Sequence, residues 1–501
     1  MLRRFQISLL PVLSLLLLAC ASVSPERERA TEVALSPAPL DNWPGLLGLA
    51  QEDRMVPLNR GAPGLHWRVR ALRAATRSID LQTFIWKADG VGLALVREVV
   101  AAAERGVRVR VLLDDSFLVH ADDALQALSQ HANISYRIYN PVAQRGGGPV
   151  LRQLENINDI ARINHRMHNK LMVVDGRIAI MGGRNLADEY YGYEAEHNFR
   201  DFELLLSGPF VEQLSDVFDL YWNDPWSLPV ENLQSADGQW DYAAIDAWLQ
   251  THATEHLSLT DATSEDWAAL LSQGLPAQIK LLVDMPPDSS PDLDVPVQLA
   301  HELVARMDEV ERDMMLVSAY FIPTEPLMAA IERATARGVR VRIFTNSLGA
   351  NNHVSAHAAY AEHRPALLRA GAELYELRPD ASSRHLYLDP AVMTARLGLH
   401  EKGALFDECC LFVGSANLDP RSLRLNTEIG LLIESPPLNA RLRQLLATDL
   451  LPANAWKVEL DEYDELLWIG PAGKQRHTPP ASFYLRAESW FFGLLPIEEQ
   501  M

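Results

Sequence analysis

The sequence predicts an α/β protein built from two homologous units, each an α/β/α sandwich with a mixed sheet, packed around a pseudo-twofold axis. Each half contains a segment that reads as helix, glycine and strand, and a strand–turn–strand segment with the same polar residues. The landmarks of the two copies share one offset of 232 residues, which separates Gly106 from Gly338, His168 from His400, and Asn185 from Asn417. One offset across separate elements indicates an internal duplication.

The helix–glycine–strand segment of the first half is "GLALVREVVAAAERGVRVRVLLDD", residues 92–115. Its apolar residues recur at helical spacing until Gly106, and glycine suits the left-handed position just past a helix end. Valines then alternate with arginines, as in a strand. The segment "EPLMAAIERATARGVRVRIFTNS", residues 325–347, repeats this pattern. The arginines could form a phosphate-binding patch, but we expect them to be the solvated side of each strand.

The strand–turn–strand segments are "MHNKLMVVDGRIAIMGGRN", residues 167–185, and "LHEKGALFDECCLFVGSAN", residues 399–417. Residues two apart on a strand face the same side, so His168 and Lys170 point together, and so do His400 and Lys402. Asp175 and the glycine after it form a favourable hairpin turn. The asparagine that follows the second strand of each copy can fold back toward the same place.

The chain divides into six segments on this reading. They are a signal peptide at 1–20, a tether at 21–40, a first unit at 41–235, an acidic insertion or linker at 236–275, a second unit at 276–450, and a tail with an aromatic cluster at 451–501. The tail's aromatic residues could dip into a membrane interface or pack back on the body.

The N-terminus "MLRRFQISLLPVLSLLLLAC" has a basic start and a short apolar run, as in a signal peptide. Its "LLAC" resembles a bacterial lipoprotein cleavage box, which implies that Cys20 carries the lipid. We therefore expect a lipid-anchored envelope protein that faces the periplasm. Ala21 favours the outer membrane by the same resemblance, although inner versus outer membrane stays open.

The formal net charge of −21 disfavours a nucleic-acid partner, because basic surface normally supplies that affinity. The adjacent Cys409 and Cys410 lie in an apolar run, and we expect them to be buried strand residues without a disulfide. No cysteine or histidine spacing resembles a zinc site, so we expect no metal and no cofactor.

The duplicated polar set of two histidines, two lysines and two asparagines suits a phosphodiester. One neutral imidazole can attack phosphorus while the opposite imidazolium protonates the departing alkoxide, since the pKa of imidazole lies near neutrality. The lysines and the asparagine amides can hold the non-bridging oxygens. The group could then pass to an alcohol or to water.

The pattern H-x-K-x4-D-x6-G-[GS]-x-N occurs twice and resembles the phospholipase D superfamily. The resemblance covers residues 45 to 440 and implies a metal-independent reaction through a phosphohistidine. It places the site on His168, Lys170, Asp175, Gly182, Gly183 and Asn185 in the first copy, and on His400, Lys402, Asp407, Gly414, Ser415 and Asn417 in the second. By the same resemblance Asp175 and Asp407 support the catalytic residues, whereas Asn185, Asn417 and Ser415 contact phosphate.

The resemblance also implies that an acidic residue orients each histidine. "NTEIG" supplies Glu428 for His400, and "FRDFE" supplies Asp201 for His168. Spacing alone would select Glu196, but Asp201 is preferred because a strand-like apolar run follows it, as one follows Glu428.

Longer stretches such as "GSANLDPRSLRLNTEIG" are similar to bacterial cardiolipin synthases of the C type. This implies a phosphatidyltransferase that makes cardiolipin from phosphatidylglycerol and a second phospholipid, either phosphatidylethanolamine or another phosphatidylglycerol. The alternatives are a phospholipase D-type hydrolase, a nuclease, or a lipid-binding envelope lipoprotein without activity. Phe84, Trp86, Tyr320 and Phe321 could line an acyl channel or be core aromatics. One chain supplies both halves of the site, so a monomer suffices.

Overall fold

The computed structural model describes residues 31–118, 121–143, 145, 156, 159–233, 240–253, 263–286, 298–479 and 482–493. The predicted signal peptide and the lipidation site Cys20 lie outside the described residues. Of the predicted tether, residues 31–40 are described and lie against the first unit, where the backbone N–H of Ala38 donates to the carbonyl of Asp175 at 2.8 Å.

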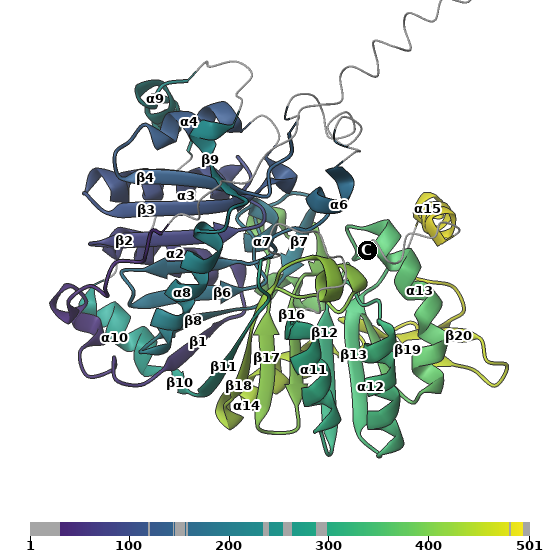
Figure 1. Cartoon of the computed structure of the whole chain (residues 1–501). Coiled ribbons are helices and arrows are strands. Elements are labelled where there is room, and N and C mark those ends of the chain that lie inside the picture. Colours follow the sequence, from purple (N-terminus) through teal and green to yellow (C-terminus); the bar gives the residue numbers. More distant parts are fainter. Residues whose placement is uncertain are drawn as a thin grey trace, which may run out of the picture.

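The first unit contains a nine-stranded mixed sheet with the order β10-β1-β8-β6-β5-β2-β3-β4-β9 (Figure 1). Strands β2, β3 and β4 are parallel, and the other neighbours are antiparallel. The strands are β1 Arg54–Leu58, β2 Ser78–Thr83, β3 Arg108–Asp114, β4 Ile134–Tyr139, β5 Leu171–Val174, β6 Ile178–Gly182, β8 Glu203–Ser207, β9 Ser227–Pro229 and β10 Leu275–Pro276. The helices are α2 Gly61–Ala74, α3 Gly90–Glu104, α4 Asp122–Ser129, α6 Ile160–Ile163, α7 Asp188–Tyr191 and α8 Phe210–Trp222.

The second unit contains a ten-stranded mixed sheet with the order β11-β18-β17-β16-β12-β13-β14-β19-β20-β21. The strands are β11 Gln278–Val283, β12 Asp313–Ser318, β13 Arg340–Asn346, β14 Glu373–Leu377, β16 Lys402–Phe406, β17 Cys410–Gly414, β18 Ile429–Glu434, β19 Ala455–Leu460, β20 Leu466–Gly470 and β21 Gly473–Gln475. The helices are α11 Gln298–Asp308, α12 Glu325–Ala336, α13 Val354–Arg369, α14 Pro436–Asp449 and α15 Phe483–Gly493. The run β18-β17-β16-β12-β13-β14 repeats β8-β6-β5-β2-β3-β4 of the first sheet. The predicted α/β duplication is therefore confirmed.

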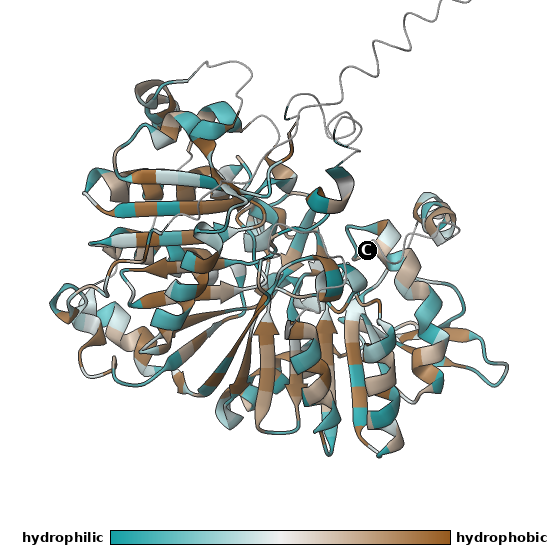
Figure 2. Cartoon of the chain, in the orientation of Figure 1, coloured by the Kyte–Doolittle hydropathy of each residue, from teal (hydrophilic) through white to brown (hydrophobic). Residues whose placement is uncertain are grey.

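Apolar side chains form three layers of core. One layer lies between the first sheet and α2, α3 and α4, and another lies between the second sheet and α11, α12 and α13. The third is shared by the facing sides of both sheets together with α8 and α14, and it joins Leu171 and Met181 to Leu405 and Val413. Figure 2 shows how strongly hydrophobic residues concentrate in the strands, whereas the helices carry hydrophilic residues as well. The shared layer holds the two units in a fixed relation.

The expectation that the strand arginines are solvated is wrong for Arg110. This side chain is 1% exposed, and it pairs with Asp80 and Asp219, both at 2.7 Å. Its guanidinium carbon also lies 4.7 Å from the centre of the Phe218 ring. Helix α8 covers this face of the sheet, so the alternation of valine and arginine marks a buried ion pair at Arg110 instead of a solvated surface.

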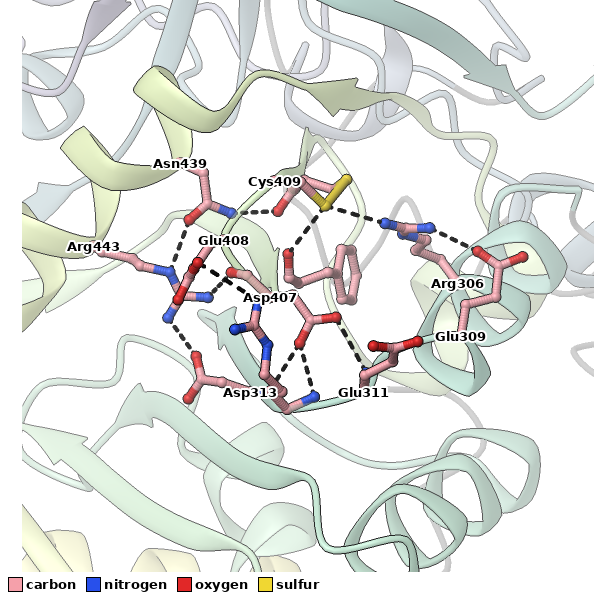
Figure 3. Close-up of a disulfide and its surroundings, with 12 residues drawn as sticks. Arg306, Glu309, Glu311, Asp313, Asp407, Glu408, Cys409, Asn439 and Arg443 are labelled. Carbon is pink, nitrogen blue, oxygen red and sulfur yellow. Dashed lines mark hydrogen bonds and ion pairs between the residues drawn. A yellow bond between two sulfur atoms is a disulfide. The ribbon is translucent and has the colours of Figure 1, made fainter.

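The expectation that Cys409 and Cys410 remain unpaired is also wrong, because the structure joins them in a disulfide (Figure 3). The pair lies at the turn of the β16–β17 hairpin, and β17 begins only at Cys410. Before the strand begins, neighbouring side chains need not point to opposite faces, so the two sulfurs can meet. Arg306 contacts the sulfur of Cys409 at 3.7 Å.

The described parts of the insertion and of the tail pack on the two units. Helices α9 Tyr242–His252 and α10 Ser264–Ser272 come from the insertion, and α9 lies on α3 and α4. In the tail, β19, β20 and β21 extend the second sheet, and α15 packs on α13 while Tyr484, Trp490 and Phe491 stay exposed. None of the helices within the described residues is both long and apolar enough to cross a membrane.

Candidate active site

The two histidine–lysine pairs lie beside the ends of β2 and β12, one pair in each sheet. Strand β5 begins directly after Lys170 and is antiparallel to β2, while β16 begins at Lys402 and is antiparallel to β12. Each pair therefore lies at the carboxyl end of β2 or β12, the edge where α/β sheets usually bind ligands. All four side chains are buried, between 1% and 7% exposed.

The two units interlock at these histidines through backbone pairing. Strand β7, His197–Arg200 of the first unit, runs parallel to β15, Arg396–Leu399 of the second, and the N–H of His400 donates to the Arg200 carbonyl at 2.8 Å. In the same way Met167 pairs with Thr427, and the N–H of His168 donates to the Thr427 carbonyl at 2.9 Å. Each histidine thus follows a segment paired with the other unit.

This interlock places each acidic residue beside the histidine of the opposite unit. Glu428 Oε2 lies 2.9 Å from His168 Nδ1, and Asp201 Oδ2 lies 2.7 Å from His400 Nδ1. The expected pairing of acid and histidine within one half is therefore wrong, because the partner of each histidine is set by the strand pairing between the units. A carboxylate at Nδ1 holds the proton there and leaves Nε2 free to act.

Glu196, the residue that spacing alone would select, lies exposed on the loop before β7. Its backbone carbonyl accepts from the N–H of Arg396 at 2.9 Å, so it contributes backbone pairing instead of a carboxylate to the site.

Ser415 supports Glu428 instead of facing a phosphate. Its hydroxyl donates to Glu428 Oε2 at 2.5 Å and accepts from the N–H of Ile429 at 3.0 Å. Gly183 occupies the matching position in the first unit, and a Cβ there would lie 2.1 Å from Asp201 Oδ1. The [GS] position of the motif therefore lies against the carboxylate: Gly183 leaves room for Asp201, whereas Ser415 donates to Glu428.

Both lysines are anchored to the backbone of their own histidine. Lys170 Nζ donates to the His168 carbonyl at 2.6 Å, and Lys402 Nζ donates to the His400 carbonyl and lies 3.1 Å from His400 Nδ1. Burial lowers the pKa of Lys170 to about 7 and the pKa of Lys402 to about 8. The site therefore contains two buried amino groups, and each attracts an anion when it is protonated.

The histidines are poised as neutral bases. Burial, together with the positive charges of Lys170 and Lys402, lowers the pKa of His168 to about 4 and the pKa of His400 to about 3, although the carboxylate at each Nδ1 acts in the opposite direction. Burial alone would raise the pKa of Asp201, but His400 and Lys402 hold it at about 2. An anionic phosphodiester between the two units would raise both histidine pKa values, because it stabilises the charged imidazolium.

The two motif asparagines differ in their contacts. Asn185 Nδ2 donates to the Tyr190 hydroxyl at 2.9 Å, and its Oδ1 accepts from the N–H of Ile85 at 3.2 Å. Asn417 is 5% exposed, and its Oδ1 has no hydrogen-bond partner within the described part of the chain. Asn185 therefore fixes the loop after β2, whereas the Oδ1 atom of Asn417 makes no such contact.

Asp175 and Asp407 lie at the opposite end of the motif hairpins, where both adopt positive φ. Asp175 accepts from three consecutive backbone N–H groups at 2.8–2.9 Å, those of residues 76–78 before β2, and from Trp43 Nε1. Asp407 accepts from the matching groups of residues 311–313 before β12. Both residues thus support the sheet, at the end of the hairpin away from the histidines.

Aromatic rings surround the two imidazoles, and Tyr190 and Phe199 were not among the residues predicted from the sequence. Tyr190 and Phe199 lie 4.9 and 5.2 Å from the His400 ring, and Phe84 lies 4.8 Å from the His168 ring. Aromatic residues just after the first motif, in "EYYGY", were the available signal for Tyr190. Across the described ranges, no three His, Cys, Asp or Glu side chains are grouped in a way that could hold a metal ion.

The chain is similar to known proteins both in sequence and in fold. A family model described as "Cardiolipin synthase, PLD-like domain" matches residues 69–222 and 303–450, one segment in each unit. Cardiolipin synthase C of Escherichia coli (strain K12) is 34% identical over 466 residues, which cover 91% of this chain and 96% of that protein. An uncharacterized protein of Helicobacter pylori is 30% identical over 453 residues, 88% of each chain. The crystal structure of phosphatidylserine synthase from Haemophilus influenzae Rd KW20 shares the fold, with a TM-score of 0.58 at 15% identity, covering 92% of this chain and 100% of that one.

Proposed function

The chain belongs to the cardiolipin synthase family with a phospholipase D-like domain, and on that premise we propose that it makes cardiolipin through a phosphohistidine. The donor is phosphatidylglycerol or phosphatidylethanolamine, and the acceptor is the glycerol hydroxyl of phosphatidylglycerol. The observation that carries the proposal is the cross-paired site, in which each unit supplies one carboxylate-held imidazole and one buried lysine.

In the first step, neutral His168 attacks the donor phosphorus through Nε2. The phosphorus–oxygen bond to the donor head group breaks, and that oxygen takes the proton from the imidazolium of His400. Glu428 supports the positive charge that grows on His168, because a carboxylate at Nδ1 stabilises an imidazolium. The products are a phosphatidyl group on His168, a free head-group alcohol and neutral His400.

In the second step, neutral His400 takes the proton of the acceptor hydroxyl. The acceptor oxygen attacks phosphorus, and the bond between phosphorus and His168 Nε2 breaks. Cardiolipin leaves, and both histidines return to their starting protonation states. Water in place of the alcohol would give phosphatidic acid, so hydrolysis is the competing outcome of the same intermediate.

The remaining polar groups stabilise charge on the non-bridging oxygens. Lys170 and Lys402 bring two ammonium groups into a buried site, where electrostatic contacts with a phosphate are stronger than in water. The NH₂ group of the Asn417 amide would add a neutral donor. Preorganised charge of this kind is the main way proteins stabilise phosphoryl-transfer transition states.

The test is mass spectrometry of lipids after purified protein is incubated with phosphatidylglycerol vesicles, with and without phosphatidylethanolamine, in the presence of EDTA. We expect cardiolipin from the native protein and none from His168→Ala or His400→Ala. His385→Ala, which changes an exposed histidine outside the site, is the matched control. Phosphatidic acid without cardiolipin would make the protein a hydrolase. No product together with no phosphate trapped on histidine would leave a lipid-binding lipoprotein.

We also propose that the protein is anchored in the bacterial envelope by a diacyl group on Cys20 and faces the periplasm. The support is the signal-like N-terminus, since buried acyl methylenes contribute about 0.8 kcal/mol each and can hold an acidic protein at a bilayer. Labelled palmitate should enter the native protein and not Cys20→Ala, and membrane fractionation then separates inner from outer membrane.

A further inference from the structure

An apolar cavity of about 250 Å³ lies in the first unit between α3, α4 and the insertion helix α9. Its lining comes from several elements: Leu93 and Val96 of α3, Ala124 and Leu125 of α4, and Trp248 and Leu249 of α9. Of these, only Leu249 is fully buried, and the others are partly open to the cavity. Packed interiors leave few voids larger than a water molecule, so a space of this size is a feature to be explained.

The chemistry of the lining excludes most ligands. The only charged residue along it is Lys87, and the ammonium group of Lys87 is already paired with Glu189. Its other polar groups are a tyrosine hydroxyl and the indole N–H groups of tryptophans, each part of a mostly apolar ring, so the lining is predominantly hydrocarbon and aromatic. An apolar cavity of about 150 Å³ already holds a benzene molecule, so this one has room for a length of hydrocarbon chain.

The loops that follow β2 and β3 line one side of the cavity and also lead to the candidate active site. Phe84, after β2, contacts the His168 ring at 4.8 Å and the Phe117 ring at 5.4 Å. Two residues after Phe84 the chain reaches Trp86, and one residue after Phe117 it reaches Leu118, and both line the cavity. The two loops that carry this aromatic pair therefore reach both the His168 ring and the apolar space.

We propose that this cavity holds one acyl chain of the phosphatidyl group while that group is attached to His168. The inference rests on the proposed function and names a binding site for the lipid part of its substrate. It also gives the insertion a role, because α9 supplies one wall of the cavity and nothing equivalent is needed for the phosphate chemistry. The occupant enters from the His168 side, where the covalent bond would hold its other end.

The test uses Ala124→Trp, which fills the cavity, and phosphatidylglycerols of graded acyl length presented as monomers. For the native protein we expect kcat/KM to rise about fourfold with each added methylene until the cavity is full. Ala124→Trp should lose more than about tenfold on the longer chains relative to the shortest, the effect of two methylenes. Its cleavage of bis(p-nitrophenyl) phosphate, which has no acyl chain, should match the native rate.

The matched control is Ala101→Trp, a change at a partly buried alanine of α3 that does not line the cavity. An unchanged chain-length profile in Ala124→Trp would overturn the acyl site while leaving the transferase intact. A native protein that cleaves the chromogenic diester and no phosphatidylglycerol would instead overturn the proposed function.

A second measurement does not depend on the variant folding. Phosphatidylglycerol with a photoreactive diazirine at the chain end should label peptides of α4 or α9 in the native protein. Labelling confined to other elements would overturn the proposal.

Discussion

Two single substitutions, Asp201→Asn and Glu428→Gln, test the role of each histidine separately. Each carboxylate holds the histidine of the opposite unit, so each substitution should impair one of the two histidines. The hydrogen bonds at stake are 2.7 Å to His400 and 2.9 Å to His168, and both carboxylates are fully buried. An amide can present its NH₂ to Nδ1, which would move the ring proton to Nε2 and remove the reactive lone pair. The same substitution in a serine protease triad costs about 10⁴-fold in kcat, so we expect about 10³- to 10⁴-fold in the step that each histidine serves.

The assay is the release of p-nitrophenolate from bis(p-nitrophenyl) phosphate, followed on a rapid time scale. This leaving group departs as an anion, so the first step needs His168 and no general acid. Breakdown of the intermediate still needs His400 as a base. Asp201→Asn should therefore release about one equivalent in a burst and then turn over slowly, whereas Glu428→Gln should show no burst.

Glu196→Gln serves as the control, because this exposed residue is the one that spacing alone would pair with His168. It should behave as the native protein does. The reversed pattern, with a burst only in Glu428→Gln, would make His400 the nucleophile. Near-native kinetics in both Asp201→Asn and Glu428→Gln would refute the cross-paired scheme.

Three further predictions follow from the same geometry. With the chromogenic diester, kcat/KM should fall as pH rises through about 7 to 8, since Lys170 and Lys402 lose their positive charge there and bind the anion only when protonated; a flat profile up to pH 10 would contradict those pKa values. Gly183→Ala should lower kcat at least about tenfold with little change in folding, because its Cβ would displace the Asp201 carboxylate, and circular dichroism checks the fold. Asp175→Ala should lower the free energy of unfolding by about 3–5 kcal/mol, because several N–H donors lose their acceptor; urea denaturation measures this, and cleavage per folded molecule should stay near the native value.

Local sequence patterns predicted the duplicated hairpins because their information lies within about twenty consecutive residues. The spacing of His168 and Lys170 on a strand, and the turn at Asp175, depend only on backbone geometry. The burial of Arg110 could not be read in this way, because the face of the sheet that it occupies is covered by α8, a helix about a hundred residues later. The disulfide between Cys409 and Cys410 was not predicted for a related reason. The exact start of a strand decides whether two adjacent cysteines can meet, and the sequence pattern does not fix that position.

Local sequence patterns also could not predict which acidic residue contacts which histidine, and the reason is the duplication itself. A duplicated sequence carries the same signal in each half, so it cannot say whether Glu428 serves the histidine of its own half or that of the other. Only the hydrogen bonds between the backbones of the two units make that choice. The same limit applies to the [GS] position, where Ser415 and Gly183 have roles set by the carboxylate that lies against them.

The crossing of partners makes the two halves of the site interdependent. If each acid held the histidine of its own unit, loss of that acid would affect only a histidine of the same unit. In the crossed arrangement, Glu428 of the second unit holds His168 of the first, and Asp201 of the first unit holds His400 of the second. The shared apolar layer and the pairing of β7 with β15 hold the units together within one chain, and we expect loss of either carboxylate to stop turnover. A single chain therefore holds both cross-paired histidines.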